Sequence, residues 1–477
     1  MASRLTGLLG WGLATTLGCG GELPPTGQVR LFVDTDAMVP AAPDDLTSTD
    51  GPSPLFDTLI VDVYEPDADA PCEGCTRAFA VDEGQLRAAE VSFGIPAEPG
   101  VDGYVVRLRL YSASATLTGE VPGPTEQGPP PSVIDRWVSL PVVSEEGVVD
   151  VNVRLGTDQV GLPVGTRNDP VQAERGPIAS SAVGTWPGAA GVPCAGVAAE
   201  GEVCVPGGAF WMGHPRAIGT GIGDAWNRPR LVQLAPFFLD QQEVTVAQWR
   251  AFDPTGGPEA TAWSGASSGD ALLDYCTFTV DPGPRDALPM ACVTVEGARA
   301  NSQTRGNDKP TEAQLEYVAG GLESRLFVWG SDEPACDDAV LRRYGYGIFL
   351  DLGLAGCLPE TPPGGAEVVG GLIEVPRRDR LSLPGGEIYD LVGNVSEWAL
   401  DRWNRQSEPC WSAGGVYVDP VCLRDSPLDG SFPVFRLGSF AVGSRQAIAA
   451  ARSFIDSQVA KNGNGIDLGF RCARPGI

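Results

Sequence analysis

The sequence is poor in histidine, and this shortage limits the chemistry open to the protein. His214 is the one histidine among 477 residues. A zinc site of three histidines, a multi-histidine iron site and a two-metal histidine cluster are therefore excluded within one chain. A Ser-His-Asp triad would have to use His214 itself, which lies in the turn-like context Trp-Met-Gly-His-Pro, so we do not expect one.

Basic side chains are also scarce relative to acidic ones, with 33 Lys and Arg against 61 Asp and Glu and a formal net charge of −28. This charge repels nucleic-acid phosphates and anionic membrane surfaces, so we expect no nucleic-acid partner. The acidity suits solubility in an extracellular medium. The length predicts roughly two to four domains, and the 62 glycines and 42 prolines predict many turns and few long helices.

Long apolar runs are missing after the N-terminus, where no segment reaches the roughly 18 residues that a transmembrane helix needs. Residues 1–19 have the composition of an export signal, because Arg4 precedes an apolar run from Leu5 to Leu17. The run ends in Thr16-Leu-Gly-Cys19, which resembles a bacterial lipobox, although Leu is usual where Thr16 stands. We expect an exported lipoprotein, anchored through Cys19 in the bacterial cell envelope (outer membrane or periplasmic face); ordinary secretion is the alternative.

Most of the twelve cysteines fall in close sequence pairs. In an oxidising compartment this proximity predicts five short-loop disulfides: Cys72 with Cys75, Cys194 with Cys204, Cys276 with Cys292, Cys336 with Cys357, and Cys410 with Cys422. The Cys72-Glu-Gly-Cys75 motif also has the spacing of a redox site or half a zinc site, but no second CxxC completes a zinc site. Cys19 and Cys472 are left over.

Residues 28–155 are predicted to form an all-β unit. Period-two alternation of apolar and polar residues, typical of half-buried strands, occurs in six segments: Val29–Val33, Leu59–Tyr64, Val91–Phe93, Val105–Tyr111, Val138–Leu140 and Val148–Leu155. We expect a β-sandwich of immunoglobulin-like type that serves as a spacer or adhesive module. Residues 156–193 lack periodicity and are rich in Gly, Pro, Ala and Ser, which predicts a linker; residues 194–477 form the second unit.

Segment 388–398, Ile-Tyr-Asp-Leu-Val-Gly-Asn-Val-Ser-Glu-Trp, combines two carboxylates with a Gly-Asn turn. Asp390 and Glu397 could meet across the turn, and the carbonyls of Gly393 and Val395 could join them around one ion. Carboxylate and carbonyl oxygens are the ligands that Ca²⁺ takes. A Gly-Asn pair between two β-like runs is also typical of a hairpin, and the spacing alone leaves both interpretations open.

The second unit contains a series of motifs in a fixed order. They are Val205-Pro-Gly-Gly-Ala-Phe-Trp-Met-Gly213, Pro236-Phe-Phe-Leu-Asp240 followed by Glu243-Val-Thr245 and Trp249 to Phe252, Pro289 to Ala298, Lys309-Pro-Thr-Glu-Ala-Gln-Leu-Glu-Tyr317, Phe327-Val-Trp-Gly330, segment 388–398 and Leu468-Gly-Phe-Arg-Cys-Ala473. Together they resemble the formylglycine-generating enzyme (sulfatase-modifying factor) family. The resemblance implies a C-type-lectin-like fold, which is mixed α+β and rich in loops.

Local sequence also supports two of the helix starts that the resemblance implies. Thr245-Val-Ala-Gln248 and Thr311-Glu-Ala-Gln314 both fit a capping box. In each, the Thr hydroxyl would accept a bond from the third backbone N–H of the helix while the Gln side chain reaches back. We therefore expect helices that begin after Thr245 and after Thr311.

The resemblance also implies a metal. Members of the family bind Ca²⁺ at the segment that matches 388–398, so it assigns a structural Ca²⁺ to the side chains of Asp390 and Glu397 and the carbonyls of Gly393 and Val395. A second Ca²⁺ site in the family follows the Trp-Gly motif. In this chain the corresponding region departs from the family pattern around Cys336-Asp-Asp338, so no residues are assigned as ligands of a second Ca²⁺.

The sequence departs from the family where the family's chemistry takes place. Its enzymes oxidise a substrate cysteine to formylglycine with O₂, and they use two cysteines near the C-terminus that hold Cu(I), an ion that selects soft thiolates. Those cysteines would fall between Gly438 and Arg452, where this chain has none. Ser444 cannot replace them, because a hydroxyl is a hard, protonated ligand. We therefore expect no copper site.

Two further departures follow from the same comparison. The family cysteine that bridges to the C-terminal Gly-Phe-Arg-Cys falls at Ser302, so Cys472 is expected to be a buried free thiol; an unexpected pairing is the alternative. Other family branches are iron-dependent sulfoxide synthases. Their iron is held by histidines, largely from an extra helical domain, and this chain has neither.

These observations favour a non-catalytic binding or structural lipoprotein whose partner is an envelope protein, a peptide or a glycan. The alternative is a formylglycine-generating type of oxidoreductase that acts on an envelope substrate through other residues. If a groove exists, we expect it near Trp329, Phe440, Arg452 and Arg471. Residues such as Trp329 and Phe440 are more often core aromatics, and one such as Arg471 is more often a structural arginine.

Overall fold

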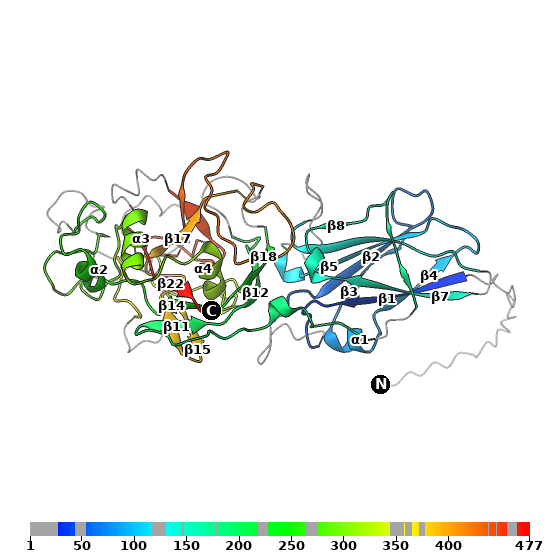
Figure 1. The fold of residues 1–477 in the computed structure, drawn as a ribbon, viewed down its shortest axis with the longest axis horizontal. Helices are drawn as coiled ribbons and strands as arrows, with labels where there is room; N and C mark the ends of the chain where they lie inside the picture. The colour runs from blue at the N-terminus through cyan, green and yellow to red at the C-terminus, as the bar shows by residue number, and fades with distance from the viewer. Residues whose placement is uncertain are drawn as a thin grey trace, which may run out of the picture.

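The structure is a computed structural model. It describes residues 27–42, 54–116, 130–144, 147–176, 180–217, 228–263, 275–343, 357, 365–371, 377–405, 407–436, 438–444, 446–455 and 465–477. The chain is mostly β with few helices, and an N-terminal unit lies beside a C-terminal unit along the long axis (Figure 1). The predicted signal segment 1–19 and Cys19 lie outside the described residues.

Two sheets make up the N-terminal unit. The first has the order β10 (Glu174–Arg175), β7 (Val148–Leu155), β1 (Gly27–Thr35), β4 (Ser92–Ala97), with β1 and β7 parallel. The second has the order β3 (Thr76–Ala80), β2 (Thr58–Tyr64), β5 (Val105–Tyr111), β6 (Val133–Ser139), β8 (Pro163–Val164), and β9 (Val171–Gln172) also pairs with β6. Four short helical turns complete the unit: α1 (Glu83–Arg87), η1 (Ala113–Ala115), η2 (Thr157–Gln159) and η3 (Pro187–Ala189).

The period-two segments form strands, while β3 and α1 were not predicted. The segments at Val29, Leu59, Val105 and Val148 correspond to β1, β2, β5 and β7, and the apolar faces of both sheets share one buried cluster. Residues of β3 are almost all exposed, so they carry no alternating pattern. Pairing with β2 alone makes this segment a strand.

Residues 156–193 do not run free as a linker would. In this segment β8 and β9 pair with β6, and β10 pairs with β7. The side chains of Val160, Val183 and Ala189 join the buried cluster of the N-terminal unit. The sequence gives no periodic pattern here because each strand is only two residues long, too short for alternation to appear.

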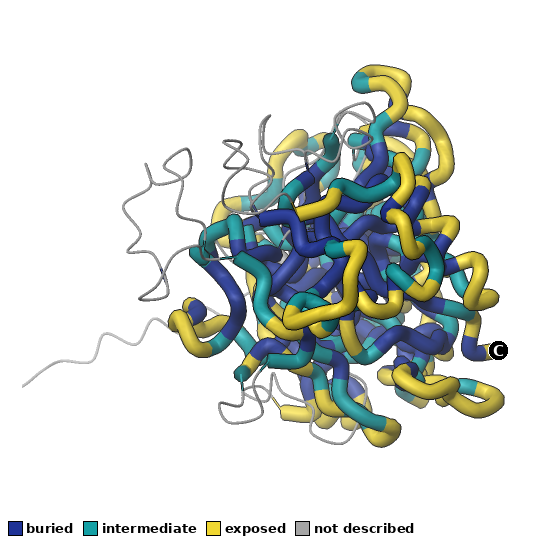
Figure 2. Tube along the Cα trace, turned by 90° about the vertical axis from the view of Figure 1, so that its left-hand side faces the viewer, coloured by how far each residue is buried: buried dark blue, intermediate teal, exposed yellow. Residues whose placement is uncertain are grey.

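The C-terminal unit consists of several small sheets with short helices and long loops. The sheets have the orders β11-β14-β22, β12-β13-β18, β15-β16 and β20-β19-β17-β21. Their strands are β11 (Glu202–Val205), β12 (Gly208–Met212), β13 (Arg230–Leu234), β14 (Phe237–Asp240), β15 (Arg380–Leu383), β16 (Gly386–Tyr389), β17 (Ser396–Arg402), β18 (Tyr417–Val418), β19 (Pro433–Arg436), β20 (Arg452–Phe454), β21 (Leu468–Gly469) and β22 (Ala473–Pro475). Buried segments gather in the middle of this unit, and exposed loops surround them (Figure 2).

In the described residues of this unit, three helices pack on the core: α2 (Val246–Phe252), α3 (Val295–Thr304) and α4 (Glu312–Ala319). Both predicted capping boxes are present, with the Thr245 and Thr311 hydroxyls accepting from the backbone N–H of Gln248 and Gln314. Thr294 caps α3 in the same way, by accepting from Gly297 N. None of the helices in the described part of the chain is long and apolar enough to cross a membrane.

The two units share a packed interface. Trp211 of β12 lies with Leu231 in the buried cluster of the N-terminal unit. Its indole Nε1 donates to the carbonyl oxygen of Leu55 at 2.7 Å, and its ring meets Phe56 edge-on with centroids 5.2 Å apart. The backbone N–H of Gly415 donates to Val160 O at 2.8 Å. A buried hydrogen bond and aromatic packing therefore fix one unit against the other.

All five predicted cysteine pairs form disulfides: Cys72–Cys75, Cys194–Cys204, Cys276–Cys292, Cys336–Cys357 and Cys410–Cys422. Each bridges a loop within one unit. Cys472 is free and buried, as the comparison with Ser302 predicted.

Candidate functional site

Segment 388–398 does not form a hairpin. Strand β16 pairs with β15, whereas β17 pairs with β19 and β21, so the runs on either side of the Gly-Asn turn belong to different sheets. Asp390 and Asn394 adopt left-handed backbone conformations with φ of 55° and 65°. Asn and Asp tolerate this region better than other non-glycine residues, and these positions let the chain cross from one sheet to the other.

Glu243 holds this crossing in place. Its carboxylate accepts from Asn394 Nδ2 at 2.8 Å and from Val395 N at 3.1 Å. The Asn394 side chain also accepts from Glu367 N at 2.9 Å. The sequence pointed to Glu243 only as part of the Glu-Val-Thr motif, because no local pattern places it beside a turn 151 residues away.

The two predicted carboxylate ligands are both buried, and each already has a partner. Asp390 Oδ2 accepts from Gly370 N at 2.6 Å. Glu397 pairs with Arg471 at 2.7 Å. The guanidinium of Arg471 also donates to the carbonyl oxygens of Tyr389 at 2.9 Å and Asp390 at 3.1 Å. Arg471 therefore binds both ends of the crossing.

Negative charge is in excess around this crossing. Burial and the neighbouring Asp390 raise the pKa of Glu243 well above its usual value. Burial raises the pKa of Asp390 to about 6 and, together with Asp390, that of Asp379 to about 8. Burial also raises the pKa of Glu397, against the pull of Arg471. Arg377 and Arg471 lower the pKa of Asp390, but burial outweighs them, and such an environment favours an added cation.

The residues at this site carry the donor types that Ca²⁺ takes, because Asp390 and Glu397 are buried carboxylates and Gly393 and Val395 have backbone carbonyls. In the described part of the chain, no group of three or more His, Cys, Asp or Glu is arranged to hold a metal. The acids around the crossing therefore do not form a carboxylate cluster, and a cation here would depend on the two carboxylates and the carbonyls.

The segment that follows the Trp-Gly motif is tied up by internal contacts. Asp338 Oδ2 accepts from Ala335 N at 2.8 Å, and Arg378 Nη1 lies 3.6 Å from the same carboxylate. Trp329 stacks on Phe327 with centroids 5.0 Å apart. Asp338 would be the first candidate ligand for a second Ca²⁺ site, but its carboxylate already caps a turn and pairs with Arg378.

The segment in which the family's two cysteines would fall is packed into the core. Ala447, Ile448, Ala449, Ala450 and Ala451 are buried in one apolar cluster, which also contains Phe327 and Leu341. Ser444 is buried too, and its hydroxyl accepts from Arg342 Nη2 at 2.8 Å. Residues 438–444 and 446–452 therefore contain no thiol, and their hydroxyl groups are buried.

The four residues predicted to line a groove do not do so together. Phe440, Arg452 and Arg471 are at most 3% exposed, and only Trp329 reaches the surface in part. Phe440 stacks on Tyr275, and Arg452 binds Glu312 at 2.7 Å. The groove prediction was wrong for these three residues, because aromatic and arginine side chains serve cores and clefts equally well.

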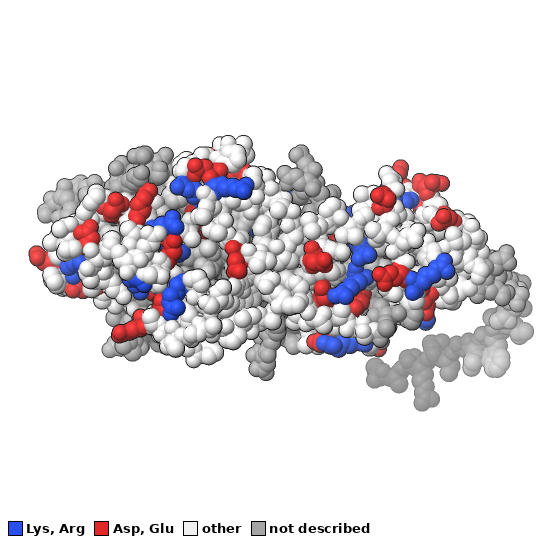
Figure 3. All heavy atoms as spheres, in the orientation of Figure 1, with Lys and Arg blue, Asp and Glu red and all other residues white. Residues whose placement is uncertain are grey.

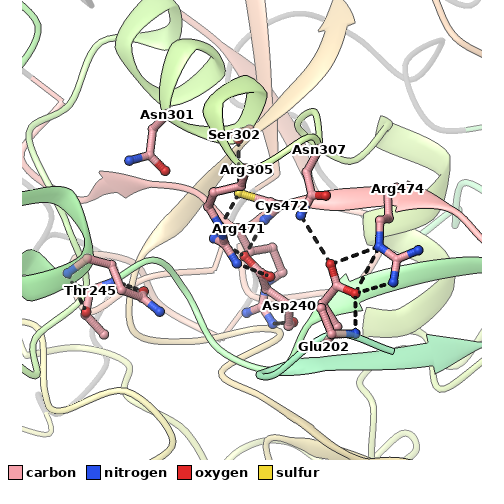
Figure 4. A network of polar contacts seen from close by, with 12 residues as sticks. Glu202, Asp240, Thr245, Asn301, Ser302, Arg305, Asn307, Arg471, Cys472 and Arg474 are labelled. Carbon is pink, nitrogen blue, oxygen red and sulfur yellow. Dashed lines mark hydrogen bonds and ion pairs between the residues drawn. The ribbon is translucent and has the colours of Figure 1, made fainter. Parts of the chain in front are cut away.

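A polar network surrounds the free thiol (Figure 4). Cys472 Sγ lies 3.0 Å from Ser302 Oγ and 3.4 Å from Arg305 Nη1. Arg305 holds Asp240 through two bonds of 2.9 Å, and Asp240 accepts from Cys472 N at 3.0 Å. Burial and Asp240 raise the pKa of the Cys472 thiol to about 12, so it is protonated at neutral pH and unreactive.

A cavity opens on the N-terminal unit instead. It has a volume of about 890 Å³ and lies between the edge strands β3 and β4. Its walls include Val63, Phe79, Phe93, Tyr104 and the Cys72–Cys75 disulfide. On the face shown in Figure 3, acidic and basic side chains are interspersed over both units. That face shows no continuous patch of one sign for a charged partner.

Comparison with known protein families identifies the family of this chain. The model of the sulfatase-modifying factor enzyme 1-like domain matches residues 191–353 and 378–475, which is more than half of the chain. The chain belongs to this family. The match contains the crossing at 388–398, the alanine-rich segment and Cys472.

Its curated relatives are formylglycine-generating enzymes. The enzyme of Streptomyces coelicolor is 28% identical over 311 residues, covering 57% of this chain and 89% of that protein. The enzyme of Thermomonospora curvata is 27% identical over 312 residues, covering 58% and 93%. Among solved structures, PvdO from Pseudomonas aeruginosa aligns with 57% of this chain and 94% of its own, at 20% identity and a TM-score of 0.37.

Proposed function

We propose that this member of the sulfatase-modifying factor family is a non-catalytic binding or structural protein of the bacterial cell envelope. The observation that supports it is the alanine-rich segment. Between Gly438 and Arg452, where the resemblance puts two Cu(I)-binding cysteines, the sequence has no cysteine, and Ala447–Ala451 are packed in the core. Without a thiolate pair, this segment has no soft ligands that select Cu(I).

Copper binding and turnover test this proposal directly. The purified mature protein is mixed with Cu(I) under a competing chelator, and O₂ consumption is followed with a cysteine-containing sulfatase peptide. We expect neither stoichiometric Cu(I) nor conversion of the peptide cysteine. The Streptomyces coelicolor enzyme serves as the positive control. One bound Cu(I) per chain, or formylglycine in the peptide by mass spectrometry, would favour the alternative of an oxidoreductase that works through other residues.

The proposed role includes a structural Ca²⁺ at the crossing, held by the side chains of Asp390 and Glu397 and the carbonyls of Gly393 and Val395. The burial of Glu243, Asp390 and Glu397, which raises the pKa of each despite nearby arginines, supports it. After chelation, added Ca²⁺ should raise the melting temperature by mass action. Asp390→Asn keeps an acceptor for Gly370 N but removes a charged ligand, so it should abolish the rise.

A matched control is Asp401→Asn. Asp401 is equally buried and accepts from the backbone N–H of Glu312 and Cys422, outside the crossing. This variant should keep the Ca²⁺ response. Equal responses in the wild type and Asp390→Asn, or none in the wild type, would count against the metal.

We propose that residues 28–155 form a β-sandwich spacer or adhesive module, and that Cys19 carries the lipid that anchors the protein. The two sheets with one shared core support the first proposal. The lipobox-like sequence supports the second. Mass spectrometry of the mature N-terminus tests the anchor: an acylated Cys19 is expected, and an unmodified N-terminus would indicate secretion. The partner is proposed to be an envelope protein, peptide or glycan.

A further inference from the structure

Arg230, the first residue of β13, is buried with a donor that has no acceptor. Its side chain is 4% exposed. Its Nη1 atom is fully enclosed and has no hydrogen-bond partner among the described residues. The guanidinium lies over the ring of Trp411, with its carbon 4.7 Å from the ring centroid. An arginine remains protonated in proteins, so a positive charge is buried here with an unsatisfied donor.

The neighbouring carboxylates are already committed. Glu312 binds Arg436 at 3.0 Å and Arg452 at 2.7 Å. Glu316 binds Arg436 at 2.8 Å and accepts from Gly213 N at 2.5 Å. These two carboxylates therefore serve two arginines fully, and the third, Arg230, is left over.

Charge around Arg230 makes its isolation more costly. Its pKa is lowered to about 10, first by burial and then by the positive charge of Arg452, while Tyr417, Glu312 and Glu316 act in the opposite direction. A buried guanidinium whose donors lack acceptors is costly to the fold. Among the described side chains, none accepts a hydrogen bond from Arg230 Nη1.

A second unpartnered donor lies at the same place. Trp411 is 4% exposed, and its indole Nε1 has no acceptor within reach in the described structure. Tyr417 holds the indole in position, because its hydroxyl donates to Trp411 O at 2.6 Å. The guanidinium Nη1 and the indole Nε1 are both enclosed, both only donors and both unsatisfied, and an acceptor carrying negative charge would satisfy them.

We propose that Arg230 and Trp411 form an internal binding site for a small monovalent anion of the halide class. The burial of both side chains leaves no open face for a large ligand, and one negative charge balances one guanidinium. The site lies outside the crossing at 388–398 and is independent of the function proposed above.

Chloride is the probe in solution. Melting of the full chain is measured in sodium chloride and in sodium gluconate at equal ionic strength, because gluconate is too large to enter. We expect a melting temperature that rises and then saturates with chloride, and no such rise in gluconate. Arg230→Met should remove the difference between the two salts, whereas Arg30→Met, at an exposed arginine paired with Asp150, should keep it.

Crystals grown in bromide give an independent reading on the wild type. An anomalous bromide peak in contact with the Arg230 guanidinium is expected. The proposal is overturned if chloride and gluconate give the same melting curve, or if the position holds only a water molecule. Should Arg230→Met fail to fold, the salt comparison and the bromide crystal still decide the question on the unmodified chain.

Discussion

Restoring the bridge between positions 302 and 472 should stabilise the protein markedly. Ser302 Oγ and Cys472 Sγ already lie 3.0 Å apart in a buried network. A disulfide needs its sulfurs about 2 Å apart, so a thiol at position 302 has to approach by about 1 Å. Ser302→Cys changes one atom of the side chain, and helix α3 and the strand β22 that follows Cys472 need little rearrangement.

The magnitude follows from the loop that the bond closes. The residues are 170 positions apart, and chain-entropy theory gives about 5 kcal/mol for a loop of that length. Engineered bonds usually deliver less, and Ser302→Cys gives up the hydroxyl's 3.0 Å bond to Ala298 O, worth about 1 kcal/mol. We therefore expect about 2–4 kcal/mol and, for a unit of this size, a melting temperature about 3–7 °C higher.

Thermal unfolding without reductant, combined with peptide mapping, measures this effect. In the wild type, Cys472 should react with an alkylating agent only after denaturation; in Ser302→Cys it should be found in a disulfide-linked peptide. Ser302→Ala is the control, because it removes the hydroxyl without adding a thiol and should cost about 1 kcal/mol. If the bond is mapped but melting is unchanged or lower, the 3.0 Å separation does not reflect compatible backbone geometry. If Cys472 stays free, the two positions are too far apart.

Three further predictions concern buried side chains and are checked by urea denaturation. Lys309 donates to Ala399 O, and burial lowers its pKa to about 7. Between pH 7 and 10 the unfolded chain therefore binds more protons than the folded chain, so the unfolding free energy should rise with pH. Lys309→Met should flatten that rise, and parallel curves for the variant and the wild type would refute the prediction. Burial raises the pKa of Asp379 to about 8. Between pH 4 and 8 the folded chain therefore binds more protons than the unfolded chain, so the unfolding free energy should fall as the pH rises. Asp379→Asn should lessen this fall, and an unchanged slope would contradict the prediction. Trp211→Ala should cost about 3–5 kcal/mol by emptying the interface and freeing Leu55 O, and a loss below about 1 kcal/mol would mean that the units do not stabilise each other.

The features that sequence predicted are those set by neighbouring residues. The capping boxes at Thr245 and Thr311 depend on side chains three positions apart, and the strands at Val105 and Val148 on alternation within one segment. The disulfides join cysteines 3 to 21 residues apart. Local chemistry decides each of these, so a single sequence suffices.

The contacts that shape the candidate site are long-range, and no local pattern reveals them. Glu243 reaches Asn394 across 151 residues, and Arg471 reaches Glu397 across 74. The placement of the site in the family came from ordered motifs, whereas the acid that holds the turn came only from the structure. Arg452 was expected to line a groove, but the structure places it in the core, where it pairs with Glu312.

Two of the buried sites described above carry charge of opposite sign. At the crossing, Glu243, Asp390 and Glu397 lie near the guanidinium groups of Arg471 and Arg377, and at the other site Arg230 Nη1 has no acceptor among the described residues. Arg471 is fixed by the carbonyls of the crossing, and Arg230 lies over the ring of Trp411. The cation proposed for the first site and the anion proposed for the second have no ligand in common, so each site should respond to its own ion in the absence of the other.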